Sequence, residues 1–284
     1  MFDQKIPMFR RILLELQSNC NRDCFFCNRI GDQTGKRIGA NGKNVRRAMP
    51  TTHALDILDQ AVAMGFTGHI SFHHMSEPFL DPRIIDMAWE AKSRGMRPYE
   101  HTNGDVLKGN DSLCQAAAEV FEYIVVGLYD YENEAELAEQ KRFWQHKLQG
   151  TQVRFSLGGE VFPRSFIPFD ARMFRAKQTY PQGVCRRPLI RLIIHYDGHV
   201  ALCCEDMVDE FELGNAFETP IKEIWYSKKH IQIIKDLEKG LRSNYSLCSR
   251  CPIPPPPPPP ALTTRIIGKV KRVGKEVASY LQKV

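Results

Sequence analysis

The sequence predicts an α/β fold with a parallel sheet, followed by a small C-terminal module made of a β-hairpin and a helix. Two observations predict this arrangement. Over the first 160 residues, short apolar runs alternate with longer helix-like runs, a pattern typical of βαβ units. Further along, two strand-like runs are joined by Asp197 and Gly198, and an Asp-Gly pair is a strong hairpin signal.

The expected elements of the first region follow one another in regular alternation. Pro82 is placed to open a helix, whereas Gly65 and Gly95 are placed to end one. Strands are expected at residues 11–17, 68–72, 97–101, 123–128 and 152–157, with helices at residues 51–64, 82–94, 112–120 and 132–148 and a sixth strand after them. Ligands of such sheets gather at the carboxyl ends of the strands, so residues directly after each strand are the first candidates for a site.

The C-terminal part is expected to contain the hairpin module and a tail. The hairpin strands are expected at residues 190–195 and 199–203, and a helix-like run covers residues 221–239. Residues 254–260 are all proline and should form a stiff spacer. Apolar residues then recur at helical spacing among basic ones, which predicts either a basic amphipathic helix or a disordered tail. The predicted domains are residues 1–180, 181–252 and 253–284.

Composition limits the class of protein. The chain has 284 residues with 43% hydrophobic content, typical of a globular protein. No run approaches 18 uninterrupted apolar residues, so no transmembrane segment is expected. The N-terminus lacks the apolar region of a signal peptide. Nine cysteines in such a chain favour metal ligation in a reducing compartment, so we expect a cytoplasmic protein.

The positive charge is concentrated at the C-terminus. The formal net charge is +6, and residues 261–284 contain six basic residues and one acidic residue. Most of the excess charge therefore lies in the tail, and the body has no general basic surface. No nucleic acid partner is expected.

Three closely spaced cysteines near the start are the most informative motif. Cys20, Cys24 and Cys27 have the spacing C-x3-C-x2-C directly after an apolar strand-like run. Three thiolates can hold three irons of a four-iron cluster and leave the fourth iron open to a substrate or cofactor. Zinc sites usually pair C-x2-C units, and a disulfide framework would use an even count, so both alternatives fit poorly.

The surroundings of this motif resemble the radical S-adenosylmethionine (SAM) superfamily. Phe26 matches the position whose backbone contacts adenine in that family, and Glu77 lies in a His-Met-Ser-Glu-Pro segment similar to the family's G-G-E-P. Met-Ser replaces Gly-Gly here, so Glu77 and the general position carry the match. Asn103 lies in a Thr-Asn-Gly segment that often ends the next strand.

The resemblance implies a fold, cofactors and roles. It implies a partial (β/α)6 barrel and a [4Fe–4S] cluster on Cys20, Cys24 and Cys27, whose open iron is chelated by the amino and carboxylate groups of SAM. An electron from the cluster would cleave SAM to methionine and a 5′-deoxyadenosyl radical. Glu77 would hold the SAM amino group, and Asn103 would lie near its ribose or carboxylate.

A second cysteine system lies in the C-terminal third. Cys185, Cys203, Cys248 and Cys251 resemble the SPASM/twitch extension of radical SAM enzymes, in the shorter twitch form. The resemblance implies that these four bind one auxiliary [4Fe–4S] cluster, while Cys204 is surplus and could replace Cys203. A zinc site is the alternative. Four cysteines would saturate a cluster, and such a cluster mainly moves electrons.

Substrate residues are harder to identify. His73, His101 and Asp130 lie near predicted strand ends and could position a substrate or move protons, although each alone is better explained as a hydrogen-bonded structural residue. We assign none of them as the catalytic base. The Gly-rich basic stretch at residues 29–47 predicts either a solvated insertion or a lid for an acidic or peptidic partner.

The expected function is radical SAM chemistry with an external electron donor. The resemblance to peptide-modifying maturases favours a ribosomally made peptide as substrate, undergoing cross-linking, epimerisation or backbone excision, with or without a separate leader-binding accessory protein. The alternative is a twitch-type small-molecule dehydrogenase acting on an aminocyclitol or sugar. A third hypothesis, a non-catalytic iron–sulfur or zinc protein, is disfavoured by Glu77 and the Thr-Asn-Gly segment.

Overall fold

The computed structural model describes most of the chain. The described residues are 6–24, 27, 29, 35–39, 42–157, 179–206 and 210–256. A compact unit ends at Pro254, and Pro255 begins a second unit. The predicted amphipathic tail lies outside the described residues, and the predicted boundary at residues 180 and 181 stays a prediction. None of the described helices is long and apolar enough to cross a membrane.

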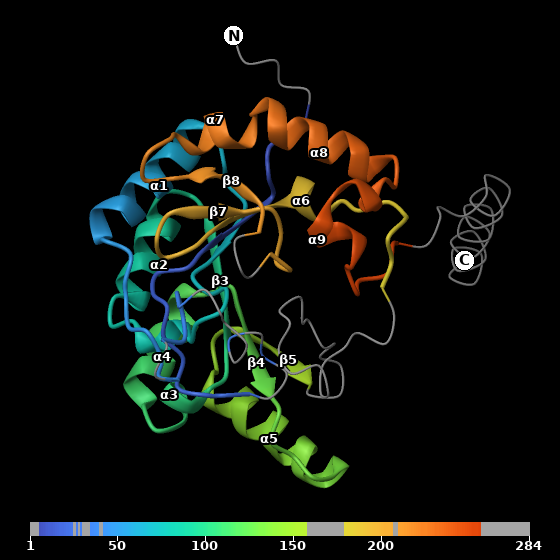
Figure 1. The fold of residues 1–284 in the computed structure, drawn as a ribbon. Helices are drawn as coiled ribbons and strands as arrows, with labels where there is room; N and C mark the ends of the chain where they lie inside the picture. The colour runs from blue at the N-terminus through green and yellow to red at the C-terminus, as the bar shows by residue number, and fades with distance from the viewer. Residues whose placement is uncertain are drawn as a thin grey trace, which may run out of the picture. The chain divides into compact units, whose positions relative to one another are not determined.

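An eight-stranded sheet organises the compact unit (Figure 1). Its strand order is β5-β4-β3-β2-β1-β6-β7-β8, parallel from β5 to β6 and antiparallel from β6 to β8. The strands are β1 (Arg11–Leu14), β2 (His69–Ser71), β3 (Arg97–Thr102), β4 (Tyr123–Leu128), β5 (Gln152–Leu157), β6 (Arg191–Ile194), β7 (His199–Ala201) and β8 (Glu212–Asn215). The predicted α/β architecture is confirmed, with parallel strands from β5 to β6 followed by an antiparallel hairpin module.

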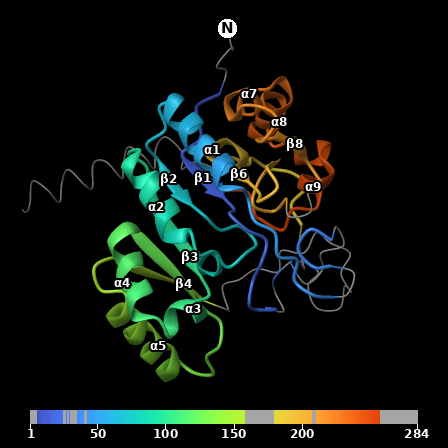
Figure 2. The same ribbon diagram turned by 90° about the vertical axis from the view of Figure 1, so that its left-hand side faces the viewer.

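Helices cover one face of the parallel strands. Figure 2 shows α2, α4 and α5 along the outer side of β2, β3 and β4. The helices are α1 (Thr51–Ala63), α2 (Ile84–Ser93), α3 (Asp105–Lys108), α4 (Asp111–Val120), α5 (Glu134–Lys147), α6 (Arg187–Ile190), α7 (Ile221–Trp225), α8 (Lys228–Glu238) and α9 (Ser246–Ser249), with 3-10 turns η2 (Pro78–Leu80) and η4 (Arg242–Asn244).

Alternation along the strands separates two apolar layers. Ile12 and Leu14 of β1 belong to the main core beneath the helices. Leu13, between them, packs with Ile193 and Cys204 on the opposite face of the sheet. Because successive side chains of a strand point to opposite faces, odd-numbered residues of β1 and β6 share the inner face. Polar residues that follow β1 and β6 with the same alternation lie at the carboxyl edge of the sheet.

The hairpin module is joined to the barrel by strand pairing. The predicted hairpin is present as β6 and β7, with Gly198 in the turn at φ 84°. However, β6 also pairs in parallel with β1, with Ile12 opposite Leu192. The predicted strand at residues 190–195 therefore does not belong to the small module alone. Sequence periodicity does not specify which strand lies beside which.

Two other expectations differ from the structure. The helix predicted at residues 221–239 is split into α7 and α8, because Ser227 caps the second helix by accepting a hydrogen bond from His230 N. The short elements α3 and β8 were not predicted. The strands predicted at residues 123–128 and 152–157 coincide with β4 and β5.

Candidate functional site

Residues from three strand ends meet at the carboxyl edge of the sheet. Glu77, after β2, accepts hydrogen bonds from Thr102 Oγ1 at 2.7 Å and Asn103 N at 2.8 Å, both at the end of β3. The side-chain Nδ2 of Asn103 lies 3.9 Å from the Sγ of Cys20, which follows β1. The predicted cofactor residues Glu77 and Asn103 are thus in direct contact, beside the first cysteine of the triplet. Phe26 lies outside the described residues.

The Glu77 carboxyl is almost completely buried, with an exposed fraction of 3%. Burial raises its pKa to about 7, and the hydrogen bonds from Asn103 N, Thr102 and Phe79 N oppose that rise. A buried carboxylate that holds three donors is a pre-organised acceptor. It could accept a further hydrogen bond from an ammonium group.

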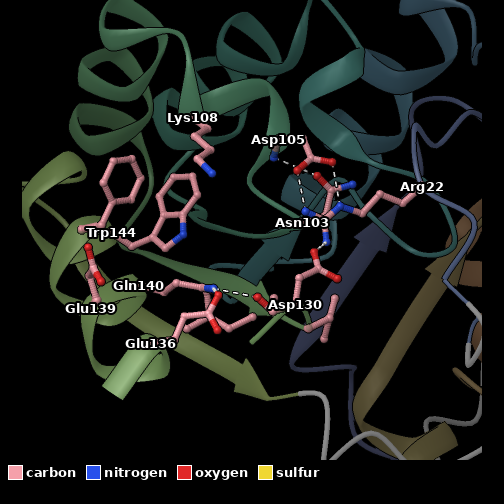
Figure 3. A pocket seen from close by; sticks show the side chains of 13 residues that line it. Arg22, Asn103, Asp105, Lys108, Asp130, Glu136, Glu139, Gln140 and Trp144 are labelled. Carbon is pink, nitrogen blue, oxygen red and sulfur yellow. Dashed lines mark hydrogen bonds and ion pairs between the residues drawn. The ribbon is translucent and has the colours of Figure 1, made fainter. Parts of the chain in front are cut away.

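The cysteine loop is fastened to the barrel by ion pairs that line a pocket (Figure 3). Arg22 contacts both carboxylate oxygens of Asp105, with Nε to Oδ2 at 2.6 Å, and its Nη1 lies 2.7 Å from Asp130 Oδ2. The pocket has a volume of about 450 Å³ and is also lined by Lys108 of α3 and by residues of α5, among them Glu136. These pairs place the loop over the ends of β3 and β4.

The three thiols of the triplet influence one another. Burial raises the pKa of Cys20, and burial together with Cys27 and Cys20 raises the pKa of Cys24 to about 11. Iron binding would offset the free-energy cost of deprotonating these thiols, because iron binds thiolates. Among the described residues, no group of three Cys, His, Asp or Glu side chains is arranged to hold a metal ion. Three thiols in one short loop are the donor type that holds iron–sulfur clusters.

Four of the five C-terminal cysteines line one cavity. Cys185, Cys203, Cys248 and Cys251 share it with Leu237, Leu247 and other residues. They come from the segment before α6, the turn after β7, α9, and the position two residues after α9. Burial raises the pKa of Cys248 to about 12, and Cys185 and Cys251 add to the rise. The four thiols around this cavity suit an iron–sulfur cluster.

Cys204 points away from this cavity. Its sulfur accepts hydrogen bonds from Arg187 Nη1 at 3.1 Å and Arg191 Nη1 at 3.5 Å. It packs with Leu13 and Ile193 on the inner face of the sheet. The two adjacent cysteines in the turn after β7 therefore lie in different environments. Cys203 faces the other three thiols, whereas Cys204 packs on the inner face of the sheet. The sequence alone left open which of the two faces them.

The Gly-rich stretch is fastened to the body at its described residues. Arg37 is 2% exposed, and its guanidinium lies 2.7 Å from Glu15 Oε2, which is also completely buried. Burial acts to raise the pKa of Glu15, but Arg37, His195 and His74 outweigh it and lower that pKa to about 2. Arg29 is also buried and donates to the Met75 carbonyl oxygen at 2.9 Å. Neither arginine is exposed to an acidic partner.

A histidine pair, one ring buried and the other half-buried, joins the barrel to the hairpin. His74, after β2, and His195, after β6, approach at 2.9 Å between Nδ1 and Nε2. Burial lowers the pKa of His74 well below its ordinary value, and the neighbouring His195 adds to the effect. Both rings lie close to Glu15 and Arg37. These side chains form a polar network where the segments after β1, β2 and β6 meet.

The three candidate substrate residues divide into two groups. His73 and His101 lie side by side, with ring centroids 4.4 Å apart. His73 Nδ1 lies 2.8 Å from Glu100 Oε1. Asp130 is elsewhere, 75% exposed and paired with Arg22. Sequence reasoning missed Glu100, and the available signal was an acidic residue inside a strand predicted to be buried.

The comparisons with known proteins agree with this geometry. Residues 185–252 match the SPASM family model, described as an iron–sulfur cluster-binding domain. The S-adenosyl-L-methionine-dependent 2-deoxy-scyllo-inosamine dehydrogenase of Niallia circulans is 26% identical over 256 residues, which are 86% of this chain and 93% of that protein. The chain is a radical SAM enzyme with a C-terminal SPASM domain.

Solved structures place this radical SAM enzyme in the same fold group. A crystal structure of BtrN in complex with AdoMet and 2-DOIA aligns with a TM-score of 0.69 at 22% identity, covering 87% of this chain and 94% of that one. Native anSMEcpe with bound AdoMet and the Cp18Cys peptide aligns with a TM-score of 0.52 at 13% identity, covering 87% and 88%. The cofactors are a radical SAM cluster with SAM and an auxiliary iron–sulfur cluster.

Proposed function

We propose that this radical SAM enzyme is an oxidoreductase that converts a hydroxyl group of a small polyhydroxylated molecule, such as an aminocyclitol, to a carbonyl. The observation that carries the proposal is the cavity lined by Cys185, Cys203, Cys248 and Cys251. Four thiolates leave no open iron position, so a cluster there would accept an electron and would not bind substrate. Oxidation of an alcohol needs such an electron acceptor.

The roles of the N-terminal residues follow from their positions. Cys20, Cys24 and Cys27 would hold a [4Fe–4S] cluster, and the Glu77 carboxylate would accept a hydrogen bond from the SAM amino group. When bound, the cluster and SAM supply an electron and a hydrogen-abstracting carbon radical. Asn103 orients Glu77 through its backbone N–H and approaches Cys20 through its side-chain amide.

The small-molecule alternative is better supported than the peptide substrate. A relative that aligns over most of both chains is named as a dehydrogenase of 2-deoxy-scyllo-inosamine. The similarity to anSMEcpe, at 13% identity, concerns the fold alone. In addition, the buried positions of Arg29 and Arg37 remove two basic residues that the loop would offer a peptide.

The test is an anaerobic assay of reconstituted protein with reductant, SAM and 2-deoxy-scyllo-inosamine. We expect 5′-deoxyadenosine and a ketone in equal amounts, measured by mass spectrometry. Deuterium placed on the carbinol carbon should appear in the 5′-deoxyadenosine. Cleavage of SAM without any carbonyl product, across a panel of aminocyclitols and sugars, would count against the proposal. A modified peptide from the same preparation would restore the peptide reading.

A further inference from the structure

A histidine–carboxylate dyad stands at the carboxyl edge of β2. The His73 ring lies at the end of that strand, and its Nδ1 is 2.8 Å from Glu100 Oε1 on the neighbouring strand β3. Ser71 Oγ donates to the same carboxylate oxygen at 3.0 Å and also contacts His73 Nδ1. Glu100 is completely buried, whereas the His73 side chain is 17% exposed. The carboxyl is thus enclosed, and the ring above it is accessible.

The Glu100 carboxylate is surrounded by donors. Phe72 N donates to Oε2 at 2.8 Å, and His101 N donates to Oε1 at 2.9 Å. The Glu100 oxygens act as hydrogen-bond acceptors for these backbone N–H groups. They therefore favour the tautomer of His73 in which Nδ1–H donates to Glu100. The opposite nitrogen, Nε2, is then the basic atom of the ring. A carboxylate that orients an imidazole in this way also stabilises its protonated form.

The dyad lies next to the SAM-binding residues. Glu100 and Thr102 are two residues apart on β3, so their side chains lie on the same face, about 7 Å apart along the strand. Glu100 contacts His73, and Thr102 contacts Glu77, four residues further along the same loop. One strand therefore positions both the proposed cofactor residue and the dyad. A substrate placed beside SAM would lie within reach of His73.

Among the described residues, charged and titratable groups come close to His73 from β3 and from its own loop. From β3 they are Glu100, His101 and Tyr99, whose ring lies edge-on to His73 with centroids 6.5 Å apart. From its own loop the group is His74, whose Nδ1 lies 2.9 Å from His195 Nε2. Burial raises the pKa of Glu100 to about 8, against its hydrogen bonds from His101, Phe72 and Ser71. A positive charge on His73 would favour the carboxylate form of Glu100, because opposite charges in contact stabilise each other.

We propose that His73 Nε2 accepts the proton of the substrate hydroxyl during oxidation and that Glu100 orients and stabilises the resulting imidazolium. This inference deepens the proposed function and rests on it. The atoms and electrons balance as follows. The carbinol C–H leaves as a hydrogen atom to the SAM-derived radical, the O–H proton moves to His73, and the remaining electron passes to an iron–sulfur cluster. The products are a carbonyl and an imidazolium ion.

The first experiment compares His73→Gln with a matched control, His69→Gln. His69 lies at the other end of β2 and also faces a glutamate, with its Nε2 3.5 Å from Glu122 Oε2. With carbinol-deuterated 2-deoxy-scyllo-inosamine, His73→Gln should form carbonyl product about 100-fold more slowly. Deuterium transfer to 5′-deoxyadenosine should stay within about 3-fold of wild type, because hydrogen abstraction precedes proton loss. His69→Gln should change neither rate appreciably.

The pH profile and chemical rescue separate a proton acceptor from a structural residue. Carbonyl formation by wild type should rise with pH as His73 loses its proton, whereas the His73→Gln profile should be flat over that range. Free imidazole should restore carbonyl formation in His73→Ala, since it can take the place of the missing base. Equal loss of deuterium transfer and carbonyl formation in His73→Gln, with no rescue, would overturn the proposal.

A third readout does not depend on turnover. Diethyl pyrocarbonate modifies only unprotonated imidazole, so the pH midpoint of His73 modification in the holoenzyme, measured by peptide mass spectrometry, reports its pKa. Removing the Glu100 charge in Glu100→Gln should lower that midpoint by about 1 unit. An unchanged midpoint would contradict the role of Glu100. Absence of carbonyl product in wild type would instead reject the proposed function and leave this measurement standing.

Discussion

The two cysteine sites are held in place by opposite means. The loop of Cys20, Cys24 and Cys27 is anchored by Arg22, which pairs with Asp105 and the exposed Asp130. The C-terminal cavity is anchored by Arg242, which is 2% exposed and donates to backbone carbonyl oxygens. Those carbonyls belong to Gly183, Tyr180, Ile253 and Val184.

This difference matches the proposed tasks. Ion pairs at the surface contribute about 0–1 kcal/mol and can rearrange when a cofactor binds. A buried guanidinium that serves several carbonyls fixes the chain, because moving it would leave buried acceptors without donors. The first site can therefore adjust to a ligand, and the second holds its thiols rigidly for electron transfer.

The largest expected effect comes from replacing one of two adjacent cysteines with serine, with the other replacement as its control. Cys203→Ser removes a thiol from the four-cysteine cavity, so iron content should fall from about eight to about four per chain. Carbonyl formation should fall at least about 100-fold while SAM cleavage persists. Cys204→Ser, the control, should keep its iron because that sulfur contacts Arg187 and Arg191. Iron analysis and Mössbauer spectroscopy measure both; loss of iron from Cys204→Ser alone would reverse the assignment.

The next effect concerns the buried anchor. Arg242→Met should lower the free energy of unfolding by about 3–5 kcal/mol, because it strips donors from buried carbonyl oxygens. Urea denaturation of the anaerobic protein measures this. Arg250→Met is the matched control, since Arg250 is 46% exposed and pairs with Glu210. Similar destabilisation by both substitutions would remove the contrast between buried and surface anchors.

A smaller effect is expected at the proposed SAM contact. Glu77→Gln keeps the shape of the side chain but removes the charge that would face the SAM ammonium group. SAM affinity should fall about 10-fold, equivalent to about 1.4 kcal/mol, as measured by anaerobic titration calorimetry. Glu90→Gln, on the surface of α2, serves as the control. Undiminished affinity in Glu77→Gln would place the SAM amino group elsewhere.

The smallest effect is expected at the surface anchor. Asp105→Asn weakens the pairing with Arg22 and should cost less than about 1 kcal/mol of stability. Its consequence should instead be kinetic, with loss of the first cluster in air about 3-fold faster than in wild type. Asp111→Asn, which removes the partner of Lys147 away from the loop, is the control. A large loss of global stability in Asp105→Asn would show that the two anchors do not differ.

The local elements and several contacts were predictable, and the connections between them were not. Periodicity and turn residues predicted β4 and β5, and strand-end placement predicted that Glu77 and Asn103 would lie at the same edge of the sheet. The choice between Cys203 and Cys204 depends on which way the turn after β7 directs each side chain. Pairing of β6 with β1, and of His73 with Glu100, depends on strand order in space. Short-range sequence patterns contain no such information.

The β1–β6 pairing has a consequence for building chimaeric enzymes. A barrel cut before Cys185 would lose β6 and leave β1 with an unpaired edge, a ready template for association with other chains. Extensions from other relatives should therefore be joined after Ile194, so that the host retains its own closing strand. In this chain the natural splice point lies inside the matched SPASM region and not at its beginning.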